Sequence, residues 1–419
     1  MAFLRAISVK EVSKLKGNIE IQGSKNTVLP IMAATLLSSG VSVIYNCPDI
    51  DDVTVMCELL KCLHVKVERN GNTLTIDTTE ADYEPLPYSL TGKLRSSVLL
   101  LGPILARWKR AEIGMPGGCA IGLRPVDIHL EGFMKMNVDI KLHKDILNCS
   151  TFHLQGCDYH MRFPSVGATE NLIMAAVGAK GRTVLRGAAK EPEIVELCNY
   201  LLSMGALIEG VGTDVLVIKG TGELTACDYC NVYDRIVAGT YLLMAAAVPS
   251  DITLTGIDDI HYMKNIIKVA AQIGVNVVKM ENCLHIQSFG KVDGGDFETG
   301  IYPEFPTDLQ PVLLTVLSKA KQDSSVEETV FENRFGIVSE LEKLGAEITV
   351  KGQRAEIKGN AELQGHTVKA TDLRQGAALV AAGLISKGYT TVTNISYIER
   401  GYEDIVRDLQ CVGVDIAYI

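Results

Sequence analysis

The chain has 419 residues, of which 47% are hydrophobic and 21% charged, and its formal net charge is −10 at pH 7. Its length indicates about two domains, and the acidic balance without a basic stripe excludes a surface that follows a nucleic-acid backbone. No apolar run approaches the roughly 18 residues of a membrane span, and scattered charges near the start argue against a secretion signal. We therefore expect a cytoplasmic protein with no nucleic-acid or membrane partner, whose oligomeric state the sequence leaves open.

Helical segments that end in a small-residue or basic turn, each followed by a short β-branched run, recur along the chain. They start at Met32, Leu100, Met174, Met244, Leu314 and Val380. A second amphipathic helix follows each of them and ends at a turn. The turns are at His64, Asn137, Gly205, Gly274, Gly345 and Gly413. Because these positions are about 70 residues apart, the sequence indicates six copies of one unit.

Each copy is predicted to form strand, helix, strand, helix, strand, strand, because helical and alternating periodicities succeed one another. The helices are apolar on most faces and the strands alternate, so we predict an α/β fold with helices inside and sheets outside. Six copies divide into two domains of three. Residues 25–231 are predicted to form the first domain, and residues 1–24 with 232–419 the second. The first strand is expected to pair with the second domain, because the last copy ends before its final strand.

The eleven cysteines are dispersed and odd in number, so we expect them to be mostly reduced. Cys227 and Cys230 form a CxxC pair. A second group lies close in sequence and consists of Cys149, His153, Cys157 and His160. Since no matching pair completes a zinc pattern, we expect no metal and assign these residues to turns and the core.

Several basic residues lie at strand-to-helix junctions that recur at equivalent points of the repeats. They are Lys25, Arg95, Arg124, Arg334, Arg374 and Arg400. Arginine presents a planar fork and lysine a compact charge, and both suit phosphate and carboxylate. These groups could converge on the face between the two domains. The alternative for any one of them is a solvated surface residue.

The segment 115–129 combines three glycines and two prolines with Cys119. A cysteine in such a loop is not a typical core residue. Close to Lys25 and Arg124, its thiolate would be favoured, which suits a nucleophile or a proton donor. Asp308 falls at a helix start in the segment FPTDLQ, where the alternative role is helix capping.

Taken together, many segments resemble the family of UDP-N-acetylglucosamine 1-carboxyvinyltransferases, in order and from end to end. They include GSKNTVLPIMAATLL, PGGCAIGLRPVDIH, SVGATENL, EPEIVELCNYLLSMGA, FPTDLQ, ETVFENRF, ATDLRQGAALV and ERGYEDI. The resemblance implies a pair of inside-out α/β barrel domains and no cofactor. It also implies transfer of the enolpyruvyl group of phosphoenolpyruvate to the 3'-hydroxyl of UDP-N-acetylglucosamine, the first committed step of peptidoglycan precursor synthesis and the target of fosfomycin.

The resemblance also implies roles for single residues. Cys119 would be the general acid toward C3 of phosphoenolpyruvate and could form a covalent adduct, and Asp308 would accept the proton of the sugar hydroxyl. Lys25, Arg124 and Arg400 would hold the phosphate and carboxylate. Further substrate-binding residues would be Asn26, Arg95, Pro125, Val126, Asp127, Ile128, Ser165, Val166, Gly167, Val330, Arg334 and Arg374. Because these residues come from both domains, a complete site is expected to need both.

The sequence departs from the family pattern at a few positions. Phe163 and Pro164 stand where many members have a lysine near the uracil, and Arg162 could supply that charge from the neighbouring position. Tyr233 and Val237 replace the usual proline and glutamate. These departures bear on nucleotide affinity and on any regulatory contact.

Two alternatives remain open from the sequence. The first is the sister enzyme that acts on shikimate 3-phosphate, against which the cysteine loop and FPTD argue. The second is a catalytically silent UDP-sugar-binding sensor. A sensor would be expected to lose one of the residues Cys119, Lys25, Asp308 or Arg400, and all are present.

Overall fold

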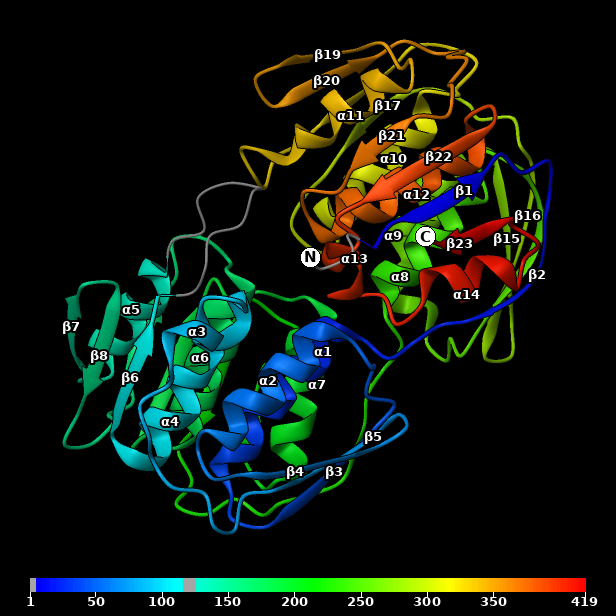
Figure 1. Ribbon diagram of the computed structural model, residues 1–419. Helices are drawn as coiled ribbons and strands as arrows, with labels where there is room; N and C mark the ends of the chain where they lie inside the picture. Colours follow the sequence, from blue (N-terminus) through cyan, green and yellow to red (C-terminus); the bar gives the residue numbers. More distant parts are fainter. Residues whose placement is uncertain (1–4, 116–125) are drawn as a thin grey trace. The chain divides into compact units, whose positions relative to one another are not determined.

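The computed structural model describes residues 5–115 and 126–419 (Figure 1). Contacts within the chain divide these residues into two compact units. The N-terminal unit comprises residues 23–115 and 126–232, and the C-terminal unit comprises residues 5–22 with Tyr233–Ile419. Within the described ranges, no helix has the length and apolar character needed to cross a membrane.

The described residues of the N-terminal unit form three sheets, with strand orders β13-β3-β5-β4, β6-β8-β7 and β11-β12-β10-β9. The strands are β3 (Val41–Tyr45), β4 (Lys66–Asn70), β5 (Thr73–Asp77), β6 (Arg110–Gly114), β7 (Asp139–His143), β8 (Ile146–Ser150), β9 (Asp158–His160), β10 (Arg182–Arg186), β11 (Leu207–Glu209), β12 (Val215–Lys219) and β13 (Tyr229–Cys230). The helices are α1 (Lys25–Ala34), η1 (Thr35–Leu37), α2 (Asp51–Lys61), α3 (Tyr88–Thr91), η2 (Arg95–Leu100), α4 (Leu101–Trp108), α5 (Asp127–Lys135), α6 (Val166–Val177) and α7 (Pro192–Ser203).

The described part of the C-terminal unit likewise has three sheets, with orders β15-β16-β14-β2, β17-β18-β20-β19 and β21-β22-β1-β23. The strands are β1 (Ile7–Lys10), β2 (Leu15–Glu20), β14 (Pro249–Thr255), β15 (Val275–Met280), β16 (Cys283–Phe289), β17 (Asp296–Glu298), β18 (Ser324–Glu327), β19 (Ile348–Lys351), β20 (Arg354–Ile357), β21 (Thr367–Lys369), β22 (Tyr389–Thr393) and β23 (Ile416–Tyr418). The helices are α8 (Arg235–Met244), η3 (Ile260–Met263), α9 (Lys264–Gln272), η4 (Thr307–Leu309), α10 (Gln310–Leu317), η5 (Arg334–Ile337), α11 (Val338–Lys343), α12 (Leu373–Ile385), α13 (Ser396–Glu399) and α14 (Ile405–Gln410).

The first helix of each repeat is buried almost all round. Every residue of α12 is buried, and so is every residue of α8 after Arg235. The strands instead alternate, as in β14, where buried positions take every second place. Within the C-terminal unit, Figure 1 shows β1 and β22 passing over α12. The prediction of helices inside and sheets outside is therefore confirmed.

The six turns that define the repeat share one backbone conformation. Each has a positive φ between the second helix of its copy and the following strand: His64 (59°), Asn137 (68°), Gly205 (100°), Gly274 (97°), Gly345 (102°) and Gly413 (90°). Residues with a Cβ adopt this region at a cost, which explains the preference for glycine and the tolerance of asparagine. The repeat in the sequence is thus a repeat in backbone geometry.

The two N-terminal strands pair within the C-terminal unit, and the expectation concerned the first of them. β1 lies between β22 and β23 and pairs antiparallel with both, and β2 pairs parallel with β14. Near the end of the N-terminal unit, β13 pairs parallel with β3 of the same unit. The last copy therefore obtains its missing strand from the start of the chain.

The second copy departs from the predicted order of elements. Its first strand is reduced to a single parallel bridge between Leu86 and Ile113. Pro85 and Pro87 flank Leu86. Leu86 N donates to the Glu112 carbonyl at 3.2 Å, so the nitrogens of the two prolines point away from β6, as is usual for prolines on the edge of a sheet.

Candidate active site

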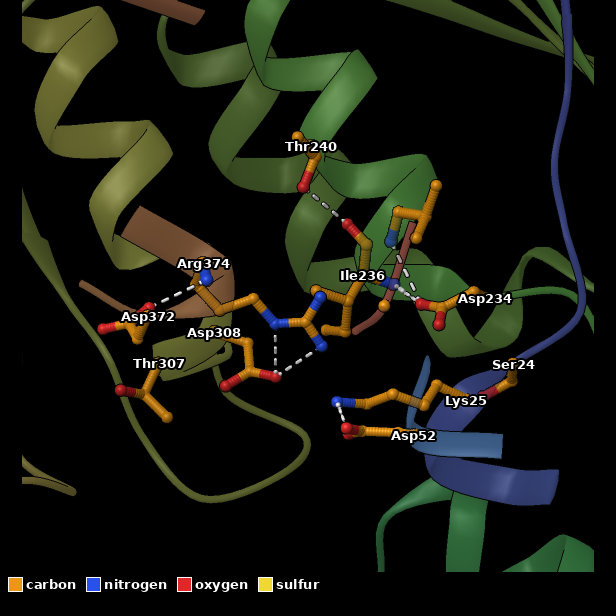
Figure 2. A network of polar contacts seen from close by, with 12 residues as sticks. Ser24, Lys25, Asp52, Asp234, Ile236, Thr240, Thr307, Asp308, Asp372 and Arg374 are labelled. Atoms are coloured by element: carbon orange, nitrogen blue, oxygen red, sulfur yellow. Dashed lines mark hydrogen bonds and ion pairs between the residues drawn. The ribbon is translucent and has the colours of Figure 1, made fainter. Parts of the chain in front are cut away.

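One carboxylate of the C-terminal unit is held by two buried arginines. Asp308 Oδ1 accepts a hydrogen bond from Arg334 Nη2 at 3.2 Å, and Oδ2 accepts from Arg374 Nε at 3.0 Å and Nη2 at 2.9 Å. Figure 2 shows Asp308 facing the guanidinium of Arg374. The side chains of Arg334 and Arg374 are only 2% and 6% exposed, whereas that of Asp308 is 28% exposed. The carboxylate is thus held in direction by two buried guanidinium groups on a side chain that is partly exposed.

Two alternatives from the sequence are wrong for this cluster. Asp308 is not a helix cap, because Pro306 occupies the N-cap position of η4 and the Asp308 carboxylate is turned to the guanidinium groups. Arg334 and Arg374 are not solvated surface residues, because both are buried. Burial alone would lower the pKa of Arg374, but the charge of Asp308 outweighs it and raises that pKa above its ordinary value.

Glu328 connects the Asp308 segment to the predicted ligand residue Val330. Its Oε1 accepts from the backbone N–H groups of Val330 and Phe331, each at 3.0 Å, and its Oε2 accepts from Thr307 Oγ1 at 2.9 Å. Glu328 is fully buried. The sequence reasoning missed this residue, because its partners can be recognised only from the folded chain.

Lys25, the first residue of α1, is paired with an aspartate that the sequence reasoning also missed. Lys25 Nζ lies 3.1 Å from Asp52 Oδ2, and the two side chains are 13% and 6% exposed (Figure 2). Asn26 follows on α1 and is half-buried. Gly23, two residues before Lys25, has no room for a side chain, because a Cβ there would lie 1.8 Å from the carbonyl oxygen of Asn46. The backbone approach that leads into Lys25 therefore requires glycine.

Apart from Val330, which belongs to the C-terminal unit, the described residues predicted for the nucleotide sugar lie at three adjoining helix starts of the N-terminal unit. Arg95 opens η2, Val126 to Ile128 open α5, and Ser165 to Gly167 open α6, with Ser165 Oγ accepting from Ala168 N at 3.3 Å. Helix α6 packs against both α5 and η2. The structure therefore brings these residues together.

His129 of α5 lies within this group. Its Nδ1 is 3.1 Å from Asn171 Nδ2 of α6, and its ring faces Gly167, where a Cβ would lie 3.4 Å from His129 Cε1. Asn171 Nδ2 also donates to the Val98 carbonyl, so we assign Nδ1 as the acceptor and the imidazole as neutral. Burial, with a contribution from the charge of Arg95, lowers the pKa of His129 to about 3.

Arg162 binds two carboxylates of α5. Its guanidinium pairs with Asp127 and donates to Glu131 Oε1 at 2.7 Å. Tyr159 adds bonds from its hydroxyl to Glu131 Oε2 at 3.0 Å and to the Ile128 carbonyl at 3.3 Å. These contacts tie the connection between β9 and α6 to the first turns of α5. The Arg162, Asp127 and Glu131 side chains are 51%, 42% and 45% exposed, so ligands can reach them.

The remaining predicted residues are placed as follows. Arg400 ends α13 and is half-buried, beside Gly401, where a Cβ would meet Leu373 Cδ2 at 2.6 Å. Cys119, Arg124 and Pro125 lie outside the described residues. Over residues 5–115 and 126–419, no group of three or more His, Cys, Asp or Glu side chains could hold a metal ion.

Similarity to known proteins defines the class. Residues 9–409 match the family model of EPSP synthase (3-phosphoshikimate 1-carboxyvinyltransferase). The enolpyruvyl transferase NikO from Streptomyces tendae superposes with a TM-score of 0.90 at 25% identity, covering 99% of this chain and 98% of that chain. EPSP synthase from Acinetobacter baumannii shares the fold, with a TM-score of 0.77 at 16% identity over 99% of this chain and 100% of that one. The fold is that of the enolpyruvyl transferases, with two α/β domains as predicted.

Curated relatives narrow the class further. UDP-N-acetylglucosamine 1-carboxyvinyltransferase 1 of Caldanaerobacter subterraneus subsp. tengcongensis is 42% identical over 408 residues, which are 97% of this chain and 98% of the relative. UDP-N-acetylglucosamine 1-carboxyvinyltransferase 2 of Staphylococcus saprophyticus is 40% identical over 414 residues, 98% of each chain. The chain belongs to the family of UDP-N-acetylglucosamine 1-carboxyvinyltransferases.

Proposed function

We propose that the protein transfers the enolpyruvyl group of phosphoenolpyruvate to the 3'-hydroxyl of UDP-N-acetylglucosamine and releases phosphate. The reaction would take place in the cytoplasm as the first committed step of peptidoglycan precursor synthesis, with no metal or cofactor. The observation that carries this proposal is the Asp308 carboxylate, held by the buried Arg334 and Arg374 on a side chain that is 28% exposed. Relatives that carry the name of this activity are 40–42% identical to the chain over nearly its whole length.

Asp308 is proposed to accept the proton of the sugar hydroxyl as that oxygen attacks C2 of phosphoenolpyruvate. Two guanidinium groups favour the ionised carboxylate and fix its direction. The same charges make the carboxylate a weak base, so it cannot produce a free alkoxide beforehand. Proton transfer must therefore accompany formation of the carbon–oxygen bond.

Cys119 is proposed to supply the proton that C3 gains in this addition step. Elimination then returns the double bond: C3 loses a proton and the phosphate leaves with the electrons of its bond to C2. Lys25 and Arg400, with Arg124, are proposed to hold the phosphate and carboxylate, because cations are most effective where charge develops. Pairing of Lys25 with Asp52 directs its ammonium group before a ligand arrives.

The UDP-sugar is proposed to bind at the helix starts of the N-terminal unit. Helices α5 and α6 begin at Asp127 and Val166, and unpaired backbone N–H groups at a helix start favour phosphate oxygens. Arg95 adds a cation to the same group of elements. The half-exposed Arg162 would provide a further cation, next to the position where many members of the family have a lysine near the uracil.

Shikimate 3-phosphate is the acceptor in the nearest alternative. The likeness to EPSP synthase, at 16% identity, supports the fold alone. A catalytically silent sensor is disfavoured because Asp308 keeps its two arginines and Lys25 keeps a buried aspartate partner. Such arrangements carry a desolvation cost that binding a nucleotide sugar does not by itself require.

Phosphate release tests the proposal. The protein is mixed with phosphoenolpyruvate and UDP-N-acetylglucosamine, and each substrate is omitted in turn. We expect release only with both substrates present, and none when shikimate 3-phosphate replaces the sugar nucleotide. Release with shikimate 3-phosphate would support the sister activity. No release with either acceptor, combined with binding of UDP-N-acetylglucosamine, would support the sensor.

A further inference from the structure

Gln22 makes two hydrogen bonds to the turn that follows Arg400, one buried and one partly buried. Its side-chain Nε2 donates to the carbonyl oxygen of Gly401 at 3.0 Å, and its Oε1 accepts from the backbone N–H of Glu403 at 2.9 Å. These partners lie 379 and 381 residues away in the sequence. Gln22 itself is only 9% exposed.

The chemistry of this contact requires an amide. One partner is an acceptor and the other a donor, and an amide offers one oxygen and one N–H₂ group in a fixed plane. A carboxylate could serve only the N–H of Glu403, and an apolar side chain could serve neither partner. Buried backbone groups that lose their partner are costly, so the turn depends on this side chain for its geometry.

The turn is also held by other contacts, among them hydrogen bonds from the backbone N–H groups of Gly401 and Tyr402 to the Ile398 carbonyl, each at 3.0 Å. Gly401 packs directly against Leu373, and the hydroxyl of Tyr402 lies 2.8 Å from Thr240 Oγ1. Arg400 is therefore the last residue before a segment that is fixed at three successive positions. The position of the Arg400 side chain therefore depends on the backbone of residues 401–403.

Gln22 also lies where the chain leaves the C-terminal unit, which ends at Gln22 and resumes at Tyr233. Its backbone carbonyl accepts from Asp234 N at 2.9 Å. Asp234 in turn caps α8 through Oδ1, which accepts from Ile236 N at 2.9 Å and Val237 N at 3.0 Å (Figure 2). Gln22 thus joins the start of α8 to the Arg400 turn within one unit.

We propose that Gln22 is a positioning residue for Arg400 and thereby for the phosphoenolpyruvate site. This inference rests on the proposed function, in which Arg400 holds the phosphate or carboxylate of the donor substrate. Gln22 does not contact the substrate itself. It acts by fixing the backbone that carries Arg400.

The test uses two variants of different chemistry. Gln22→Met keeps the length of the side chain and removes both hydrogen bonds, whereas Gln22→Glu keeps the bond from Glu403 N and loses the one to Gly401. We expect Gln22→Met to raise the KM for phosphoenolpyruvate about 10-fold, the change that corresponds to about 1.4 kcal/mol. The KM for UDP-N-acetylglucosamine should stay within about 2-fold of wild type. The KM of Gln22→Glu for phosphoenolpyruvate should lie between those of wild type and Gln22→Met, because Gln22→Glu loses one hydrogen bond and Gln22→Met loses two.

A control at an exposed glutamine of the same unit is Gln322→Met. The Gln322 amide also donates to a backbone carbonyl of the same unit, that of Gly294 at 3.1 Å. Gln322 follows the C-terminal end of α10, whereas Asp308 precedes the N-terminal end of that helix. This variant should leave both KM values unchanged. Thermal unfolding of all variants separates a loss of folding from a loss of positioning.

A second arm asks whether Gln22 acts through Arg400. If it does, adding Gln22→Met to Arg400→Lys should raise the KM for phosphoenolpyruvate by less than about 2-fold beyond Arg400→Lys alone, because coupled residues are not additive. A full multiplicative effect, or Gln22→Met with wild-type KM values, would overturn the inference. Absence of turnover in the wild-type protein would instead overturn the proposed function.

Discussion

Two clusters of ion pairs in this protein use the same residue types at opposite levels of burial. In the C-terminal unit, Arg334 and Arg374 are 2% and 6% exposed around Asp308. In the N-terminal unit, Arg162 is 51% exposed beside Asp127 at 42%. Buried charges must be paired with good geometry, whereas exposed pairs contribute little and exchange readily with water and ions. The first cluster is therefore suited to chemistry that needs fixed groups, and the second to ligand binding that tolerates adjustment.

The largest effect is expected from Asp308→Ala, which leaves two buried guanidinium groups without their carboxylate. Removing one partner of a buried pair costs about 3–5 kcal/mol of stability. Loss of a positioned proton acceptor lowers turnover by about 100- to 10,000-fold. Denaturant unfolding and phosphate release measure the two losses. An unfolding free energy within about 1 kcal/mol of wild type would show that the arginines do not depend on Asp308.

A smaller effect is expected from Arg374→Lys. Arg374 offers two donors to Asp308 Oδ2, and lysine retains the charge but not the planar fork. Turnover should fall by about 30-fold, which corresponds to about 2 kcal/mol, while binding of UDP-N-acetylglucosamine stays close to wild type. The matched change in the exposed cluster, Arg162→Lys, should leave turnover within about 2-fold. Equal losses in the two variants would contradict the contrast between the clusters.

The buried His129 of the N-terminal unit makes the stability of the protein depend on pH. The pKa of His129 is about 3 in the folded protein, against 6.5 in the unfolded chain, because burial and the charge of Arg95 lower it. Between these values the unfolded chain binds a proton that the folded protein does not. The stabilising contribution is therefore complete above pH 6.5 and is lost as the pH falls toward 3. At pH 5 the free energy of unfolding should be lower by about 2 kcal/mol on account of His129.

The variant His129→Asn tests this pH dependence. Asparagine offers an oxygen to Asn171 Nδ2 without a group that titrates in this range. Unfolding free energies of wild type and variant, measured at pH 7 and pH 5, should show a smaller decrease for the variant by about 2 kcal/mol. Parallel pH profiles would contradict a buried neutral His129. Carboxylates titrate equally in both proteins and serve as the internal control.

The smallest effect on stability is expected from Arg162→Ala. Exposed ion pairs contribute about 0–1 kcal/mol, so the unfolding free energy should change by no more than this. If Asp127 and its neighbours bind the nucleotide, the KM for UDP-N-acetylglucosamine should rise by about 5-fold, equivalent to about 1 kcal/mol, with the KM for phosphoenolpyruvate unchanged. The difference from wild type should shrink as salt is added, because screening weakens exposed charges. An effect on phosphoenolpyruvate alone would place Arg162 elsewhere in the reaction.

Much of the fold could be predicted from the sequence, because its signals are local and repeated. The six turns require a left-handed residue at the same point, and His64 and Gly413 differ in type but share a positive φ. The pairing of β1 with the last copy also followed, from a count of strands. The reduction of one strand to a single bridge at Leu86 was missed, because periodicity predicts a strand but not how far its pairing extends.

The site could be predicted only in part, because a partner distant in sequence leaves no local signal. Asp308 and Arg374 were predicted one by one, but their pairing across 66 residues was not. Asp52 looks like an ordinary acidic residue in the first turn of a helix, which is where such residues are common. Glu328 and Gln22 bind backbone groups, which every residue carries, so their partners could not be recognised from residue types.

The central claim is that Asp308 takes part in the chemical step and not merely in binding. It is tested most directly with Asp308→Asn, which keeps the shape of the side chain and removes its ability to accept the proton as a carboxylate. Calorimetric binding of UDP-N-acetylglucosamine and single-turnover phosphate release are measured on the same preparation. We predict binding within about 3-fold of wild type and phosphate release slowed by at least about 100-fold. Phosphate release at the wild-type rate with binding intact would contradict the assignment of Asp308 as the proton acceptor.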